Sequence, residues 1–219
     1  MTGMTKLTAS DGHEFDCWMQ DAEGDARGAI VILQEIFGVT DQLKGVAARY
    51  AKLGYNVAIP ALFDRRQPGT VVPFDQGPVG RDLMLSLPAD EVMRDVAATV
   101  SELGKGGAKV GVIGFCWGGG LAVRAAQTQS ITAAVAFYGT KLNLYQEDDL
   151  KAPVLMHLGT TDDHVPPEMR DAFTARFPEV EVHMYEAGHA FANDARTSHV
   201  PDAAETAHDR TAAFLAKHL

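Results

Sequence analysis

The chain has 219 residues, of which 46% are hydrophobic and 22% are charged, the composition of an ordinary soluble globular protein. We therefore expect one folded domain over residues 1–219. The formal net charge of −10 argues against nucleic acid as a partner, because phosphate binding draws on clustered lysine and arginine. No run of about 18 apolar residues occurs, so we expect no membrane partner either.

The N-terminus and the cysteine content indicate in which cellular compartment the protein resides. Residues 1–6 lack the charged and then apolar pattern of an export signal. Cys17 and Cys116 are the two cysteines, which give no disulfide framework and suit a reducing compartment where a free thiol survives. We predict a cytoplasmic protein that is a monomer or a simple homo-oligomer.

Strand-like apolar runs alternate with helical stretches along the chain. A polar N-terminal segment first favours a hairpin around Asp11-Gly12. Strands are then predicted over 28–33, 55–60, 109–114, 133–138, 153–158 and 180–185, and helices over 42–53, 89–103, 121–127, 168–176 and 203–218. Residues 62–87 are rich in proline and glycine, which predicts a long irregular connection of the kind that often covers a site.

Most of the predicted strands are apolar nearly throughout rather than alternating. Such runs are typical of strands that are covered on both faces, hence of a mainly parallel sheet. The order of elements therefore predicts an α/β fold with a mostly parallel central sheet and helices on both faces.

The segment Gly114-Phe115-Cys116-Trp117-Gly118 lies between a predicted strand and a predicted helix. Its spacing matches the nucleophile elbow of α/β-hydrolases, with cysteine in the place of serine. The two flanking glycines stand where a side chain would obstruct a tight strand-to-helix turn. A structural cysteine does not need them, so we predict that Cys116 is a nucleophile at a helix N-terminus, which stabilises a thiolate.

A hydrolase nucleophile needs a base and an acid, and in this scaffold the chain order is nucleophile, acid, base. His189 directly follows a glycine-bearing turn after the last predicted strand, so we predict that it is the base. Asp162 and Asp163 both follow the strand over 153–158, and position alone barely separates them as the acid. A metal site built from these three residues and His164 would match no zinc signature, so we expect no metal and no cofactor.

Four motifs in order resemble the dienelactone hydrolase family. They are Gln-Glu-Ile-Phe-Gly-Val over 34–39, the elbow, Thr-Asp-Asp-His-Val-Pro over 161–166 and Glu-Ala-Gly-His-Ala-Phe over 186–191. The similarity runs from about Ala29 to the C-terminus. It implies an α/β-hydrolase fold and a carboxymethylenebutenolidase-type activity, the hydrolysis of dienelactone to maleylacetate.

The resemblance also implies residue roles. Cys116, Asp162 and His189 would form the catalytic triad, and Asp162 is favoured because Gly159 and Val165-Pro166 match the family without a gap. Glu35 would hold and help to deprotonate the resting thiol. The backbone N–H groups of Ile36 and Trp117 would form the oxyanion hole.

Substrate binding is where the sequence departs from the family. Two arginines of the family hold the substrate carboxylate, one in the irregular segment and one shortly after the catalytic histidine. Arg81 is a candidate for the first, but Asn193 stands in place of the second. Asparagine offers neither charge nor a bidentate fork. Either Arg196 substitutes from three residues downstream, or the substrate differs.

Three functions therefore remain open. The first is hydrolysis of a small, anionic lactone or ester, with dienelactone as the specific candidate. The second keeps the triad but acts on another activated ester or thioester, as Asn193 suggests. The third is a redox or electrophile sensor in which Cys116 is modified without turnover. A sensor requires neither Asp162 nor His189, so their presence counts against it.

Overall fold

The computed structural model describes residues 2–219. The chain divides into two compact units, Met1–Val110 and Gly111–Leu219. The single domain expected from the sequence stays a prediction. Among residues 2–219, no helix has the length and apolar character needed to cross a membrane.

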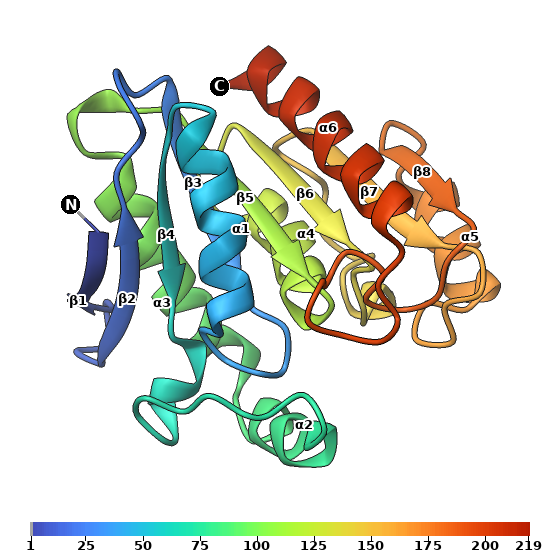
Figure 1. Ribbon diagram of the computed structural model, residues 1–219, viewed down its shortest axis with the longest axis horizontal. Coiled ribbons are helices and arrows are strands. Elements are labelled where there is room, and N and C mark those ends of the chain that lie inside the picture. Colours follow the sequence, from blue (N-terminus) through green and yellow to red (C-terminus); the bar gives the residue numbers. More distant parts are fainter. Residues whose placement is uncertain (1) are drawn as a thin grey trace. The chain divides into compact units, whose positions relative to one another are not determined.

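The first unit begins with an antiparallel hairpin of β1 (Thr2–Thr8) and β2 (Glu14–Gln20), which confirms the predicted turn (Figure 1). Gly12 has a φ of 84°, and its N–H donates to the carbonyl oxygen of Ala9 at 2.9 Å. Strand β2 then pairs antiparallel with β4 (Tyr55–Pro60), and β4 pairs parallel with β3 (Gly28–Leu33).

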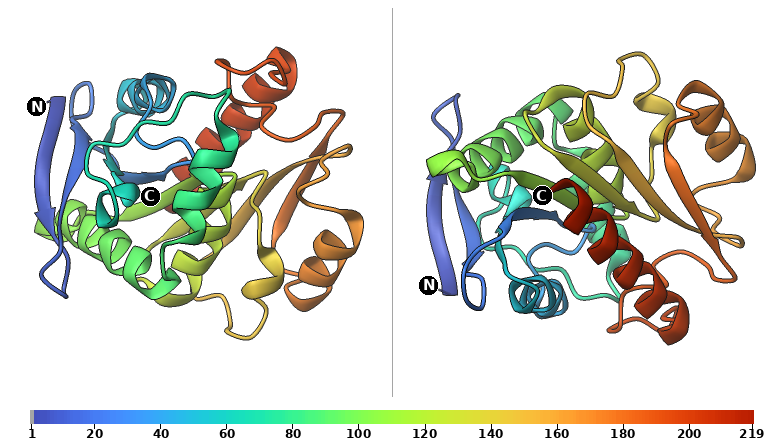
Figure 2. Two further views of the ribbon diagram at one scale, coloured as in Figure 1. Left: turned by 90° about the horizontal axis from the view of Figure 1, so that it is seen from below. Right: turned by 90° about the horizontal axis from the view of Figure 1, so that it is seen from above.

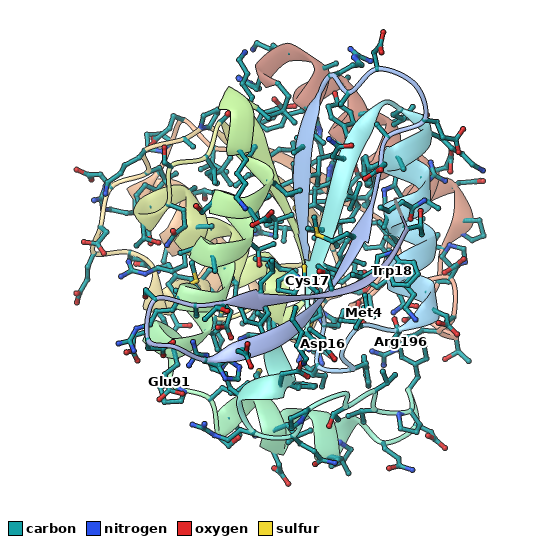
Figure 3. All side chains as sticks on the ribbon, turned by 90° about the vertical axis from the view of Figure 1, so that its left-hand side faces the viewer. Met4, Asp16, Cys17, Trp18, Glu91 and Arg196 are labelled. Atoms are coloured by element: carbon teal, nitrogen blue, oxygen red, sulfur yellow. The ribbon has the colours of Figure 1, made fainter. Side chains whose placement is uncertain are left out.

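Neighbouring residues of the hairpin strand β2 differ in burial. Met4 of β1 lies opposite Trp18 of β2, and Figure 3 shows the two side chains together. The neighbouring Cys17 side chain is fully buried. This burial raises the pKa of the Cys17 thiol to about 12, so it stays protonated and unreactive at neutral pH.

Two long helices cover the sheet of the first unit. Helix α1 (Asp41–Lys52) begins at Thr40, whose hydroxyl accepts the Leu43 N–H at 3.2 Å, and helix α3 is Ala89–Leu103. Figure 2 shows that they lie on opposite faces of β3 and β4. Every residue of β3 is buried, as expected for a strand that is covered on both sides.

The segment 62–87 is not irregular throughout, so this expectation was wrong. It contains a 3₁₀ helix, η1 (Leu62–Arg65), and an α-helix, α2 (Gly77–Leu85). Pro78 lies in the first turn of α2, where a residue needs no N–H for the helix. Gly80 packs on the backbone of Ile36, since a Cβ at Gly80 would collide with the Ile36 carbonyl oxygen. Both residue types are therefore compatible with a helix here.

The second unit contains four parallel strands in sequential order. Its elements are β5 (Val110–Phe115, which starts at the last residue of the first unit), α4 (Trp117–Thr128), β6 (Ala133–Phe137), β7 (Val154–Gly159), α5 (Pro167–Arg176), β8 (Glu181–Tyr185) and α6 (Pro201–His218). Two short 3₁₀ helices, η2 (Lys105–Gly107) and η3 (Leu142–Leu144), complete the secondary structure of residues 2–219.

Helices also cover both faces of this sheet (Figure 2). On one face, Phe173 and Phe177 of α5 pack with Val123 of α4 and with alternate residues of β6 and β7. On the other face, His157 of β7 is fully buried and bonds the Thr211 hydroxyl of α6 at 2.9 Å. Adjacent residues of β6 and β7 thus face different helices, which explains why every residue of these two strands is buried.

Helix α4 begins at Trp117, earlier than the predicted start at 121. Gly119 and Gly120 lie inside the helix, where the absence of a side chain lets another backbone segment pack against them. A Cβ at Gly119 would lie 2.6 Å from the Cα of Gly139, and one at Gly120 would collide with the carbonyl oxygen of Thr140. The backbone that follows β6 therefore contacts the first turn of α4 directly.

The contact of Gly80 with Ile36 can be tested with two glycines of one helix. The substitution Gly80→Ala should lower the free energy of unfolding by about 1–3 kcal/mol, because backbone atoms cannot move aside as a flexible side chain can. The control Gly77→Ala, at a position that faces open space, should change it by less than about 1 kcal/mol. Urea denaturation measures both, and equal effects would contradict the proposed contact.

Candidate active site

The elbow between β5 and α4 has the backbone of a nucleophile turn. Cys116 has φ 54° and ψ −116°, which is rare for a residue with a side chain. A Cβ at Gly114 would collide with the backbone of Gly118, so the turn requires glycine there. The Cys116 N–H donates to the Phe137 carbonyl at 3.0 Å, and its own carbonyl accepts the Thr140 N–H at 3.1 Å. Both backbone groups of the strained residue are thus fixed.

Positive φ values are concentrated in this part of the chain. Among residues 2–219, the non-glycine residues with positive φ are Cys116, Tyr138, Lys141 and Ala190. All four follow the carboxyl end of a strand of the second unit, namely β5, β6 or β8. Ligands of parallel α/β sheets bind beyond this end of the strands, and strained backbone is typical of functional sites.

His189 and Asp162 form a hydrogen-bonded pair. The His189 Nδ1 lies 2.9 Å and 3.0 Å from the two carboxylate oxygens of Asp162, whose side chain is fully buried. One of these oxygens also accepts the His164 N–H at 2.8 Å. Because Nδ1 donates to the carboxylate, Nε2 is the ring atom left for a proton exchange with another group.

The loops that carry this pair are joined by backbone hydrogen bonds. The Thr160 N–H donates to the Tyr185 carbonyl at 2.8 Å, and the Thr161 N–H donates to the Ala187 carbonyl at 3.1 Å. A Cβ at Gly159 would collide with the same Ala187 oxygen. The loop after β7 therefore follows the loop after β8 closely, and this contact brings Asp162 to His189.

The environment of His189 favours a protonated ring. Burial of the ring opposes protonation, but the hydrogen bond with Asp162 and the interaction with the Cys116 side chain outweigh it. Together they raise the pKa of His189 to about 10. At neutral pH the resting His189 ring is therefore protonated on both nitrogens.

Two aromatic rings border His189. The Tyr138 ring meets it edge-on at a centroid distance of 5.2 Å, and the His164 ring lies at 4.3 Å. Burial and then the charge of His189 lower the pKa of His164. We expect His164 to be neutral at pH 7, so that its ring confines His189 without adding a second positive charge.

The predicted substrate-binding residues of the second unit, Asn193 and Arg196, differ in burial and charge. Asn193 is almost fully buried, and its side-chain oxygen accepts the Ala195 N–H at 3.1 Å. This bond closes a turn of its own loop. Arg196 is half-buried, and its charge contributes to lowering the pKa of His164. Of the two, Arg196 is the one that carries a charge into the surroundings of the acid–base pair.

The predicted site residues of the first unit lie on the segment after β3 and on α2. Glu35 is buried, and Ile36 packs against Gly80. Arg81 is the next residue of α2 and is exposed. The Phe37 carbonyl accepts the Val72 N–H at 2.9 Å, so the segment 62–87 is fixed to the loop that follows β3.

Sequence reasoning did not single out Lys141 or Tyr138, although both follow the carboxyl end of β6. Their only signal in the sequence was that position after a buried strand. Among residues 2–219, no three side chains of histidine, cysteine, aspartate or glutamate gather in a way that could hold a metal ion.

Comparison with known proteins gives the family. The model of the dienelactone hydrolase family matches residues 17–219. The carboxymethylenebutenolidase of Pseudomonas putida is 32% identical over 228 aligned residues, which cover 99% of this chain and 97% of the relative. The chain belongs to the dienelactone hydrolase family. It is therefore an enzyme, a hydrolase, and the resemblance predicted from the four motifs is confirmed.

Two further relatives extend the comparison. A Bradyrhizobium sp. protein that is assigned as a 2-oxo-3-(5-oxofuran-2-ylidene)propanoate lactonase is 30% identical to this chain. The alignment covers 87% of this chain and 84% of that protein. A crystal structure from Klebsiella pneumoniae subsp. pneumoniae, assigned to the dienelactone hydrolases, has a TM-score of 0.85 at 27% identity. It covers 100% of this chain and 99% of the other, so the predicted α/β-hydrolase fold is also confirmed.

The protonation of His189 generates a testable prediction. In Cys116→Ala, the interaction of His189 with the Cys116 side chain is removed, so the pKa of His189 should fall well below about 10. A pH titration of the His189 ring signals by NMR measures it. The variant Cys17→Ala is the matched control and should leave the titration unchanged, because Cys17 is buried in another unit. An unaltered titration in Cys116→Ala would refute the coupling.

Proposed function

We propose that this enzyme hydrolyses a small activated lactone or ester through a thioester on Cys116, and that it converts dienelactone to maleylacetate. The observation that carries the proposal is the buried Asp162–His189 pair, whose ring is coupled to the elbow cysteine. The relative from Pseudomonas putida, named carboxymethylenebutenolidase, supports this substrate class.

The first half of the reaction forms the thioester. The Cys116 thiolate attacks the lactone carbonyl carbon, and the ring C–O bond then breaks to release an enolate within the same molecule. An enolate is a good leaving group, so the step needs less help from an acid than amide cleavage does. The backbone N–H of Trp117, the first residue of α4, would stabilise the oxyanion together with that of Ile36.

The second half returns the free thiol. When the sulfur of Cys116 is acylated, it no longer carries a charge, so one of the causes that raise the pKa of His189 is removed. The ring can then give its proton to the enolate and accept another from water. The hydroxide formed attacks the thioester, and the acid leaves while Cys116 regains its thiolate. Asp162 keeps the ring oriented throughout.

The roles of the first-unit residues in this proposal rest on the family resemblance. Glu35 would hold the thiol in its resting state until substrate displaces the carboxylate, which limits oxidation between turnovers. Arg81 would bind the substrate carboxylate. The two free cysteines suit a reducing cytoplasm, where we propose that the enzyme acts.

A second candidate substrate class follows from Asn193. Its side chain closes a turn and is nearly inaccessible, so it does not replace a carboxylate-binding arginine. This observation favours an activated ester or thioester with a different acyl group, on the same Cys116, Asp162 and His189. The chemistry of the thioester would be unchanged, and only the recognition of the acyl group would differ.

Assays of cis- and trans-dienelactone and of p-nitrophenyl acetate test the proposal. The variants Cys116→Ala and His189→Ala should lose on the order of 10⁴-fold or more in kcat for each substrate that the wild type cleaves. Hydrolysis that survives in Cys116→Ala would refute the nucleophile.

The variant Cys17→Ala is the matched control, since it removes the other thiol and should retain activity. A wild type that cleaves p-nitrophenyl acetate but neither dienelactone would replace the first substrate class by the second. Modification of Cys116 by electrophiles without turnover of any ester would favour the sensor.

A further inference from the structure

Lys141 has an unusual backbone for a long side chain. It follows β6 by four residues and precedes η3, with φ 58° and ψ 25°. Glycine and asparagine are the residues that usually adopt this left-handed conformation, and it is strained for residues with a longer side chain. The Lys141 carbonyl accepts the Leu144 N–H at 2.9 Å, which holds the residue in this conformation.

The backbone beside Lys141 is fixed to the nucleophile. The preceding residue, Thr140, donates its N–H to the Cys116 carbonyl at 3.1 Å. The Thr140 carbonyl lies so close to Gly120 that a Cβ there would collide with it. The segment is therefore held between Cys116 and α4. Cys116 also acts on the charge of Lys141, since it favours the protonated amine and so opposes the fall in the Lys141 pKa.

Lys141 is a cation without a carboxylate partner in the part of the chain that the structure describes. The side chain is half-buried, and among residues 2–219 no carboxylate forms an ion pair with it. Burial lowers the pKa of Lys141, and Cys116 is the one group that opposes this effect. A half-buried cation without a carboxylate is stabilised when an anion binds beside it.

We propose that the Lys141 ammonium binds the carboxylate of the substrate while Cys116 attacks its carbonyl carbon. Lys141 then supplies the charge that Asn193 cannot, because Asn193 is buried in its own turn. This inference deepens the proposed function and depends on it for the identity of the substrate. It implies a selectivity for carboxylates that can also be measured without the substrate.

Alkylation of Cys116 measures this selectivity directly. Iodoacetate and iodoacetamide both form an S–C bond to the thiolate as the C–I bond breaks and iodide leaves, but only iodoacetate carries a carboxylate. Any change in the fraction of thiolate affects both reagents alike. The ratio of the two alkylation rates therefore reports the effect of the carboxylate alone. In Lys141→Met the ratio of iodoacetate to iodoacetamide rates should fall about tenfold, and Lys141→Arg should retain most of it.

Matched variants exclude general effects. Lys151→Met removes the same charge from an exposed lysine of the same unit and should leave the ratio within about twofold. All variants carry Cys17→Ala, so that Cys116 is the one thiol alkylated. An unchanged ratio in Lys141→Met, or an equal loss in Lys151→Met, would overturn the proposal.

Steady-state kinetics then address the substrate. For Lys141→Met, kcat/KM for dienelactone should fall about 10- to 100-fold, mainly through KM, whereas 5-methylenefuran-2-one, the same ring system without the carboxylate, should change less than about threefold. Equal losses for both lactones would overturn the proposal. A wild type that does not cleave dienelactone refutes that substrate, while the alkylation ratio still decides the role of Lys141.

Discussion

The geometry of the site depends on the absence of a side chain at Gly114. The chain passes from β5 into α4 through one strained residue, Cys116, and this turn leaves no room for a Cβ two residues earlier. The strained residue is held in place because its N–H bonds the last residue of β6 and its carbonyl bonds the segment that follows β6. That same pairing fixes Thr140 and hence Lys141. One tight turn therefore places the thiol at a helix N-terminus and fixes the backbone segment that carries the lysine.

Much of the fold could be predicted because the strands are buried on both faces. Continuous apolar runs such as β3 show this directly in the sequence, and the hairpin around Gly12 has a turn chemistry of its own. The segment 62–87 could not be predicted in the same way. Proline and glycine usually break helices, but in α2 they occupy a first turn and a close backbone contact, and only the tertiary structure shows that.

The residues of the candidate site also differ in whether the sequence alone reveals them. Cys116, Asp162 and His189 could be selected from the sequence because each follows a strand, and the carboxyl ends of parallel strands share one edge. Asn193 could not be judged, since its residue type does not reveal that the side chain closes a turn. Lys141 carries no motif at all. Its left-handed backbone and its lack of an ion pair are properties of the folded chain.

The backbone hydrogen bonds between the loops after β7 and β8 bear on how the site moves. Because Thr160 and Thr161 bond the end of β8 and the loop that follows it, the segments that carry Asp162 and His189 are joined directly. Thermal motion then displaces acid and base together, and the distance between them is insulated from fluctuations of the rest of the surface. The separation that can vary during catalysis is then the distance from these two loops to the sulfur, so motion affects the proton transfer at Nε2 and not the hydrogen bond at Nδ1.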